Sequence, residues 1–132
     1  MKNEDTLAVV ARYFQYLNAE RWDEMAELWD QDARLDASGA RPRVGTEQIL
    51  EYFQKAFAPY AQHDDAPPQV LVDGGRASVD IHYVGVTHDG RDVVIDAHSE
   101  YEIERGRIVT LTTRYDIERA RQDLSPSPVR EV

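Results

Sequence analysis

Two ionisable residues, Asp80 and His82, stand two positions apart in the segment ASVDIHYVGV, residues 77–86. The surrounding Val, Ile and Tyr are typical of a β-strand, on which such a pair points to one face, with side chains about 6–7 Å apart at the base. A histidine beside a carboxylate in a partly apolar cavity can titrate near neutrality, which suits general acid–base catalysis. What the pair can do therefore depends on whether its face meets water or a pocket.

The pattern along this strand allows both orientations of the pair. Plain alternation places the apolar odd positions inside and the even positions, including Asp80 and His82, in solvent. The even face is polar only at one end, however, and becomes apolar at Val84 and Val86. Such a face also suits a pocket wall, or a strand whose far end lies under a partner subunit. The pattern by itself favours the solvent-facing orientation.

The other histidines give weaker signals. His63 lies in YAQHDDAPP, which we interpret as a loop before the first long strand, where a lone histidine is more often exposed. His98 lies on the acidic face of the segment RDVVIDAHSEYEI. Because no HxH or HxxEH spacing occurs, we predict no metal site. The sequence also contains no glycine-rich phosphate loop and no Gly-x-Ser-x-Gly elbow.

Three helices and then about four strands are predicted to position these residues. Apolar side chains recur at intervals of three and four residues in TLAVVARYFQYLN, RWDEMAELW and GTEQILEYFQKAFAP, as in amphipathic helices. The second half alternates with a period of two, and the Asp-Gly pair at 89–90 indicates a hairpin. This order predicts an α+β domain with helices on one face of a curved antiparallel sheet and a cavity between the layers.

Charge and composition narrow the classes of partner. The 132 residues include 25 acidic and 15 basic side chains, and the net charge of -10 argues against nucleic acid or an anionic membrane as a partner. Cysteine is absent, and no long apolar run or signal-peptide pattern occurs, so we expect a soluble cytoplasmic protein. We expect a single domain over residues 1–120 and a flexible C-terminal tail over residues 121–132.

Several stretches resemble one family. ARYFQYLNAERWDEMAELWDQDARL, VGTEQILEYFQKAF, the QH before VDGGRA, and ERGRIVTLTTRYD are similar to the SnoaL-like branch of the nuclear transport factor 2-like superfamily. The resemblance implies a cone-shaped α+β barrel, with three N-terminal helices on an antiparallel sheet of four to six strands, and a homodimer formed through the sheet's outer face. The superfamily includes ketosteroid isomerases, scytalone dehydratases, limonene epoxide hydrolases, polyketide cyclases and non-catalytic binders, so fold alone does not specify activity.

The resemblance implies roles for residues of the first half. Tyr13 falls where the ketosteroid isomerases keep an oxyanion-hole tyrosine, although a core aromatic on the helix stripe explains it equally well. The isomerase general base falls at Ala37, so Asp36 reaches the pocket only if the strand is bulged there. His63 falls where scytalone-dehydratase-like members place a pocket histidine.

In the second half, the same alignment places Asp80 and His82 at positions that line the isomerase pocket. The alignment therefore turns Asp80 and His82 into the pocket, whereas the pattern alone favours solvent. Val84, on the same face of the strand, would extend the pocket wall. Ser99 and Thr113 fall where family enzymes carry acids or a histidine. Together with Ala37, these departures argue against a standard isomerase, cyclase or epoxide hydrolase.

These residues together predict a cofactor-independent acid–base enzyme. We expect a cyclase, dehydratase or isomerase acting on a small hydrophobic substrate, polyketide-like or steroid-like. The expected catalytic residues are His63, Asp80, His82, Tyr13 and Asp36. The expected apolar walls are Phe14, Leu17, Tyr52, Val84, Leu111 and Tyr115. The alternative is a non-catalytic module of the same fold for ligand binding or dimerisation, which the missing acids favour.

Overall fold

The computed structural model describes residues 2–116 and 119, which form three helices and six strands. In chain order these are α1 (Asn3–Asn18), α2 (Trp22–Ala26), β1 (Trp29–Ala37), β2 (Arg43–Val44), α3 (Thr46–Phe57), β3 (Tyr60–Asp73), β4 (Arg76–Thr87), β5 (Asp92–Glu104) and β6 (Arg107–Tyr115). The predicted tail at 121–132 lies outside the described residues, and the domain boundary at residue 120 stays a prediction.

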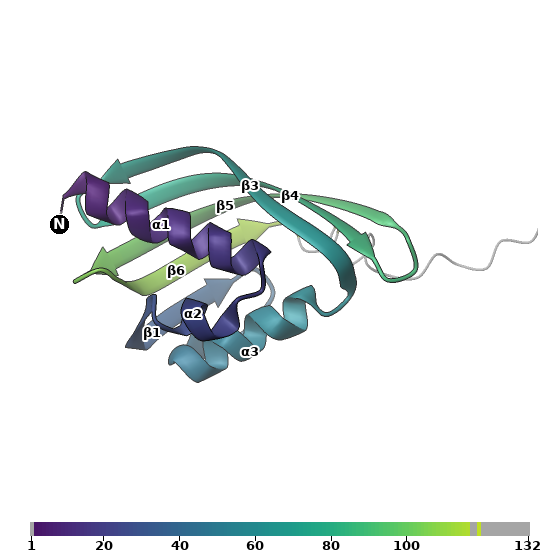
Figure 1. Ribbon diagram of the computed structural model, residues 1–132, viewed down its shortest axis with the longest axis horizontal. Coiled ribbons are helices and arrows are strands. Elements are labelled where there is room, and N and C mark those ends of the chain that lie inside the picture. Colours follow the sequence, from purple (N-terminus) through teal and green to yellow (C-terminus); the bar gives the residue numbers. More distant parts are fainter. Residues whose placement is uncertain (1, 117–118, 120–132) are drawn as a thin grey trace, which may run out of the picture.

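The strands form one curled sheet in the order β2-β1-β6-β5-β4-β3. Figure 1 shows α1 lying across the concave face of this sheet, with α2 and α3 near its β1 side. The predicted α+β cone is confirmed. The sheet is mixed rather than wholly antiparallel, because β1, the first strand of the chain, lies parallel to β6, the last.

The helices cover the concave face with the apolar stripes that the sequence predicts. Buried side chains recur at intervals of three and four residues: Val9, Val10, Tyr13, Phe14 and Leu17 in α1, and Ile49, Phe53 and Phe57 in α3. Each large apolar side chain buried in this way contributes about 1.5–3 kcal/mol, so packing stabilises these helices more than intrinsic propensity does. No helix within the described part of the chain is long and apolar enough to cross a membrane.

Strand β3 begins earlier than the sequence predicts. The segment YAQHDDAPP, interpreted above as a loop, belongs to β3 and pairs with β4. Proline is tolerated here because β3 is an edge strand, on which fewer N–H groups are needed for pairing. The register against β4 shifts between Ala66 and Gln69, on either side of the two prolines. The prolines therefore mark an irregular edge strand rather than a loop.

Candidate active site

A cavity of about 220 Å³ opens between the concave face of the sheet and helices α1 and α3. Its aromatic wall consists of Tyr13, Tyr52, Phe53, Phe57, Tyr60, Tyr83 and Tyr115. Asp65 is the only carboxylate among the described lining residues, and none of them is Lys, Arg or His. No group of three or more metal-binding side chains occurs among the described residues. A concave, mostly apolar space with few polar groups is the usual form of a small-molecule site.

Asp65 points into this cavity from β3. Its backbone is held by Asn18, whose side-chain amide donates to the Asp65 carbonyl at 3.1 Å and accepts from the Asp65 N–H at 2.8 Å. Its Oδ1 atom is buried and has no hydrogen-bond partner within the described part of the chain. Burial, followed by the charge of Asp64, raises the pKa of Asp65 to about 7. A carboxyl group with this pKa can both take up and release a proton at neutral pH.

Three buried tyrosines lie within electrostatic reach of Asp65: Tyr13, Tyr83 and Tyr101. Burial raises the pKa of each phenol well above its ordinary value, and the charge of Asp65 raises it further. The rings of Tyr13 and Tyr101 meet edge to face with centroids 5.2 Å apart. Tyr13 and Tyr83 line the cavity, whereas Tyr101 lies behind it in the core. Because the phenols of Tyr13 and Tyr83 stay protonated, they can donate hydrogen bonds to an oxygen that gains negative charge.

Ser99 and Thr113 form a neutral polar patch in the cavity wall. They face each other on β5 and β6, and the Ser99 Oγ donates to the Thr113 Oγ1 at 2.8 Å. Ser99 is only 2% exposed. At these two positions, where the resemblance implies an acid or a histidine in family enzymes, the cavity has hydroxyl groups.

His63 is buried beside the cavity rather than exposed in a loop. Its side chain is 3% exposed, and its ring stacks on Phe57 with centroids 4.1 Å apart. Neither ring nitrogen has a hydrogen-bond partner among the described residues, although Glu20 Oε2 lies 3.5 Å from Nε2. His63 is not one of the lining residues, so its contact with the site runs through the aromatic wall, at Phe57 and Tyr83.

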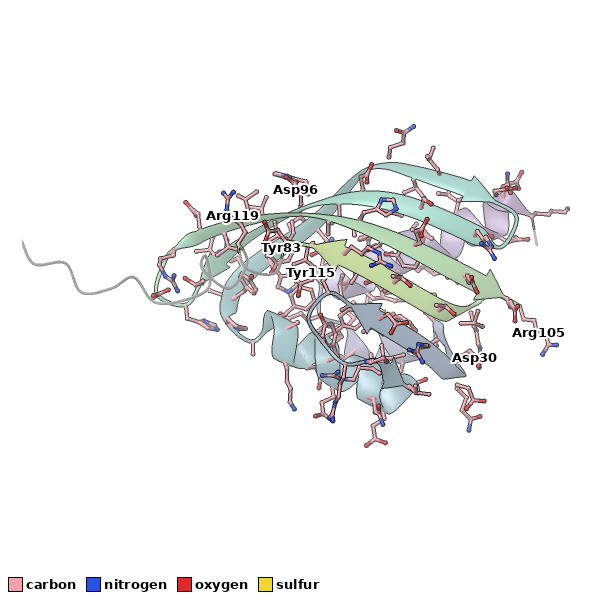
Figure 2. The ribbon with its side chains drawn as sticks, turned by 180° about the vertical axis from the view of Figure 1, so that it is seen from behind. Asp30, Tyr83, Asp96, Arg105, Tyr115 and Arg119 are labelled. Atoms are coloured by element: carbon pink, nitrogen blue, oxygen red, sulfur yellow. The ribbon has the colours of Figure 1, made fainter. Side chains whose placement is uncertain are left out.

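Asp80 and His82 lie on the outer face of the sheet, so the expectation that they line the pocket is wrong. Their side chains are 78% and 53% exposed, and they pair with His98 and Asp96 of β5 at 2.9 and 2.8 Å. Figure 2 shows Asp96 projecting away from the side chains that gather between sheet and helices, where Tyr83 lies. The apolar odd positions of β4 fill the inner face, as plain alternation indicates.

Asp36 and Val84 also face away from the cavity, which corrects two further expectations. Asp36 accepts two hydrogen bonds from Arg34, at 2.8 and 3.2 Å. The register of β1 against β6 runs without a shift from Arg34 to Ala37, so the bulge that Asp36 would need is missing. Val84 is 40% exposed on the outer face of β4.

Four of the other expected residues line the cavity: Tyr13, Leu17, Tyr52 and Tyr115. In Figure 2, Tyr115 lies with Tyr83 among the interior side chains. Phe14 and Leu111 are buried in the core, at 5% and 1% exposed, without lining the cavity.

Sequence reasoning missed Asp65 and Tyr83 as cavity residues. Asp65 lies in the stretch interpreted as a loop, and Tyr83 lies on the face of β4 opposite to Asp80 and His82. The alternation of side chains along an extended strand was the signal that could have identified Asp65 as a cavity residue. It lies two residues after His63, so in an extended segment the two side chains share one face.

A family model matches most of the chain. The model is described as a SnoaL-like domain, and it matches residues 10–111. That span runs from the middle of α1 into β6, so it includes every cavity-lining residue except Thr113 and Tyr115. No curated protein sequence matches the chain significantly.

Solved structures share the fold at low sequence identity. A Xanthomonas campestris protein proposed to be a polyketide cyclase is 18% identical with a TM-score of 0.85, over 93% of this chain and 98% of that one. An LEH-like epoxide hydrolase from M. tuberculosis is 13% identical with a TM-score of 0.78, over 92% and 90%. A Catenulispora acidiphila protein with a ketosteroid isomerase-like fold, in complex with trimethylamine, is 11% identical with a TM-score of 0.78, over 87% and 90%. These identities show the shared fold alone, and the structures that share it include complexes with small molecules, trimethylamine in one and polyporic acid in another.

Proposed function

Because the chain belongs to the family of SnoaL-like domains, we propose that it is a cofactor-independent acid–base enzyme of the cyclase, dehydratase or isomerase kind. The proposed substrate is a small hydrophobic molecule held in the cavity. One observation carries the proposal: Asp65 has an unpaired buried carboxyl oxygen and a pKa of about 7 inside an aromatic cavity. A buried carboxylate with a purely structural role would be expected to have a partner, whereas perturbed groups of this kind concentrate at functional sites.

Asp65 is the proposed general base. In its ionised form it takes a proton from the carbon next to a substrate carbonyl, and the C–H electron pair forms the double bond of an enolate. The protonated carboxyl then returns the proton to another carbon in an isomerisation, or to a departing hydroxyl group in a dehydration. In a cyclisation, the enolate carbon attacks a second carbonyl group, whose oxygen takes the proton.

Tyr13 is the proposed donor to the enolate oxygen. It lines the cavity, and its raised pKa keeps the phenol protonated. The aromatic wall keeps water away from the reacting atoms, and a hydrogen bond to a developing negative charge is stronger in such a medium than in water.

Exchange of α-hydrogens tests the proposed function without the native substrate. In deuterated water, uncharged ketones from single-ring to steroid-sized are incubated with the protein, and their α-proton signals are followed by NMR. At least one is expected to exchange faster with the protein than with the same concentration of acetate, because exchange needs only the first proton transfer. The proposal is contradicted if ketones bind the cavity and every one of them exchanges at the acetate rate.

A non-catalytic binding module of the same fold is the second candidate. The neutral Ser99–Thr113 pair supports it, since these positions lack the acids that related enzymes are expected to carry. Its expected result is a saturable ligand that is recovered chemically unchanged.

We also propose a homodimer formed through the outer face of the sheet. That face carries the two histidine–aspartate pairs of β4 and β5, and Val84 and Val94 lie opposite each other there, 40% and 43% exposed. A two-fold axis through such a face can bring the acids of one copy to the bases of the other. Sedimentation velocity at neutral pH is expected to give a dimer for the native chain and a folded monomer for Val84→Arg. A monomeric native chain would refute the dimer.

A further inference from the structure

The cavity that holds Asp65 is small, at about 220 Å³. An apolar cavity of about 150 Å³ holds a benzene molecule, so at the same filling this one holds about nine non-hydrogen atoms. That is one six-membered ring with a short substituent. A steroid-sized molecule would have to leave most of its rings outside the cavity.

The charge of the cavity wall opposes an anionic ligand. Asp65 is the only carboxylate among the described lining residues, and no lining residue is a cation that could pair with a second carboxylate. Arg43 lies over the Tyr52 ring, 5.4 Å from its centroid, but it is not part of the wall. Burying an unpaired carboxylate beside Asp65 would cost both desolvation and repulsion.

The polar atoms of the site suit an uncharged oxygen. The Asp65 carboxyl group can donate a hydrogen bond to a carbonyl oxygen when protonated, or accept one from an enol hydroxyl when ionised. The buried Oδ1 of Asp65 has no protein partner within the described residues, so a ligand hydroxyl or carbonyl there would remove the cost of an unmade hydrogen bond. The aromatic wall would enclose the rest of a ring.

From these three properties, we infer that the site takes an uncharged single-ring ketone, in its keto or enol form, and rejects carboxylates of the same size. This inference rests on the proposed function, because it names the substrate class of the same cavity. The steroid-like substrate expected from the sequence is too large for this space.

A set of three probes tests the inference by isothermal titration calorimetry. Acetophenone is an uncharged single-ring ketone, and benzoate has the same number of non-hydrogen atoms with a negative charge. The compound 2-acetylnaphthalene adds a second fused ring. Acetophenone is expected to bind roughly tenfold or more tightly than each of the other two, a difference of about 1.4 kcal/mol. Equal or tighter binding of either of them overturns the inference.

Two matched substitutions on β5 locate the bound ketone. Ala97 lines the cavity, and Ala97→Leu is expected to fill part of it and abolish acetophenone binding. Val94 is 43% exposed on the outer face of the same strand, and Val94→Leu is expected to bind acetophenone like the native chain. If Ala97→Leu does not fold by circular dichroism, Ile95→Phe replaces it, since Ile95 also lines the cavity. Unchanged acetophenone binding in the folded, filled variant overturns the inference.

Binding and exchange separate this inference from the function on which it rests. Selective acetophenone binding, with no accelerated α-proton exchange for any ketone of the set, contradicts the proposed enzyme and still supports the inferred ligand class. Faster exchange of 2-acetylnaphthalene than of acetophenone overturns the inference that the site is limited to single-ring ketones. The same result still supports the proposed enzyme activity.

Discussion

Asp65→Asn is expected to lower kcat/KM for α-proton exchange by about 10²–10⁴-fold, the usual contribution of a positioned general base. Asparagine has nearly the same shape as aspartate, but its amide cannot take up the substrate proton. The buried oxygen and the Asn18 clamp on the backbone would both remain, so ketone binding should persist while turnover is lost. Exchange rates by NMR and ketone affinity by calorimetry measure the two quantities separately.

Asp96→Asn is the matched control for this change. Asp96 lies on the outer face with its side chain 82% exposed, so the variant is expected to exchange α-protons at close to the native rate. A loss in Asp65→Asn of less than about tenfold would exclude Asp65 as the general base. A loss in Asp80→Asn with none in Asp65→Asn would return the catalytic site to the outer face.

The same base assignment gives the reaction a pH dependence. Because the pKa of Asp65 is raised to about 7, its ionised form becomes dominant only above that pH. The native kcat/KM should therefore rise with pH up to about 7 and level off above it. The residual exchange of Asp65→Asn should not show this rise.

Asp65→Asn is also expected to stabilise the fold at alkaline pH. An unfolded aspartate has a pKa of about 3.9, whereas folding raises that of Asp65 to about 7. Between these values the folded chain holds a proton that the unfolded chain has lost, so rising pH favours unfolding. The contribution of Asp65 to stability is complete below about pH 4 and is lost by about pH 8, a change of about 2–4 kcal/mol. The asparagine variant lacks this loss.

Urea unfolding of both chains across this pH range measures the effect. The difference in unfolding free energy, Asp65→Asn minus native, should increase from pH 4 to pH 8, because all other titrating groups are common to the two chains. Asp96→Asn should show no comparable increase, since Asp96 is exposed. A difference for Asp65→Asn that does not change with pH would mean that Asp65 titrates normally in the folded chain.

If Asp65→Asn loses exchange activity and gains stability at high pH, then the Asp65 side chain both supplies activity and lowers the stability of the native fold. Catalytic groups commonly have this property, because the desolvation that raises a carboxyl pKa is a cost to folding. The Asn18 side chain bears on this cost, since it fixes the β3 backbone at Asp65 through two hydrogen bonds. The end of α1 therefore holds the backbone of this edge strand in place at Asp65.

Local patterns in the sequence determined most of the fold. The intervals of three and four residues predicted α1 and α3 with their buried faces, because helical periodicity depends only on neighbouring residues. Plain alternation in β4 likewise indicated that Asp80 and His82 face water, as they do. The family resemblance predicted the cone, but it turned these two side chains to the wrong face. A shift of one residue in an alignment is enough to exchange the faces of a strand.

Only the tertiary structure decided where the candidate site lies. The prolines that follow Asp65 are compatible with a loop or with an edge strand, and the choice depends on the position of β3 in the sheet. The raised pKa of Asp65 comes from burial by α1, α3 and the neighbouring strands, which are distant in sequence. Sequence spacing shows which side chains share a face, but the dielectric environment of a carboxylate depends on everything that packs around it.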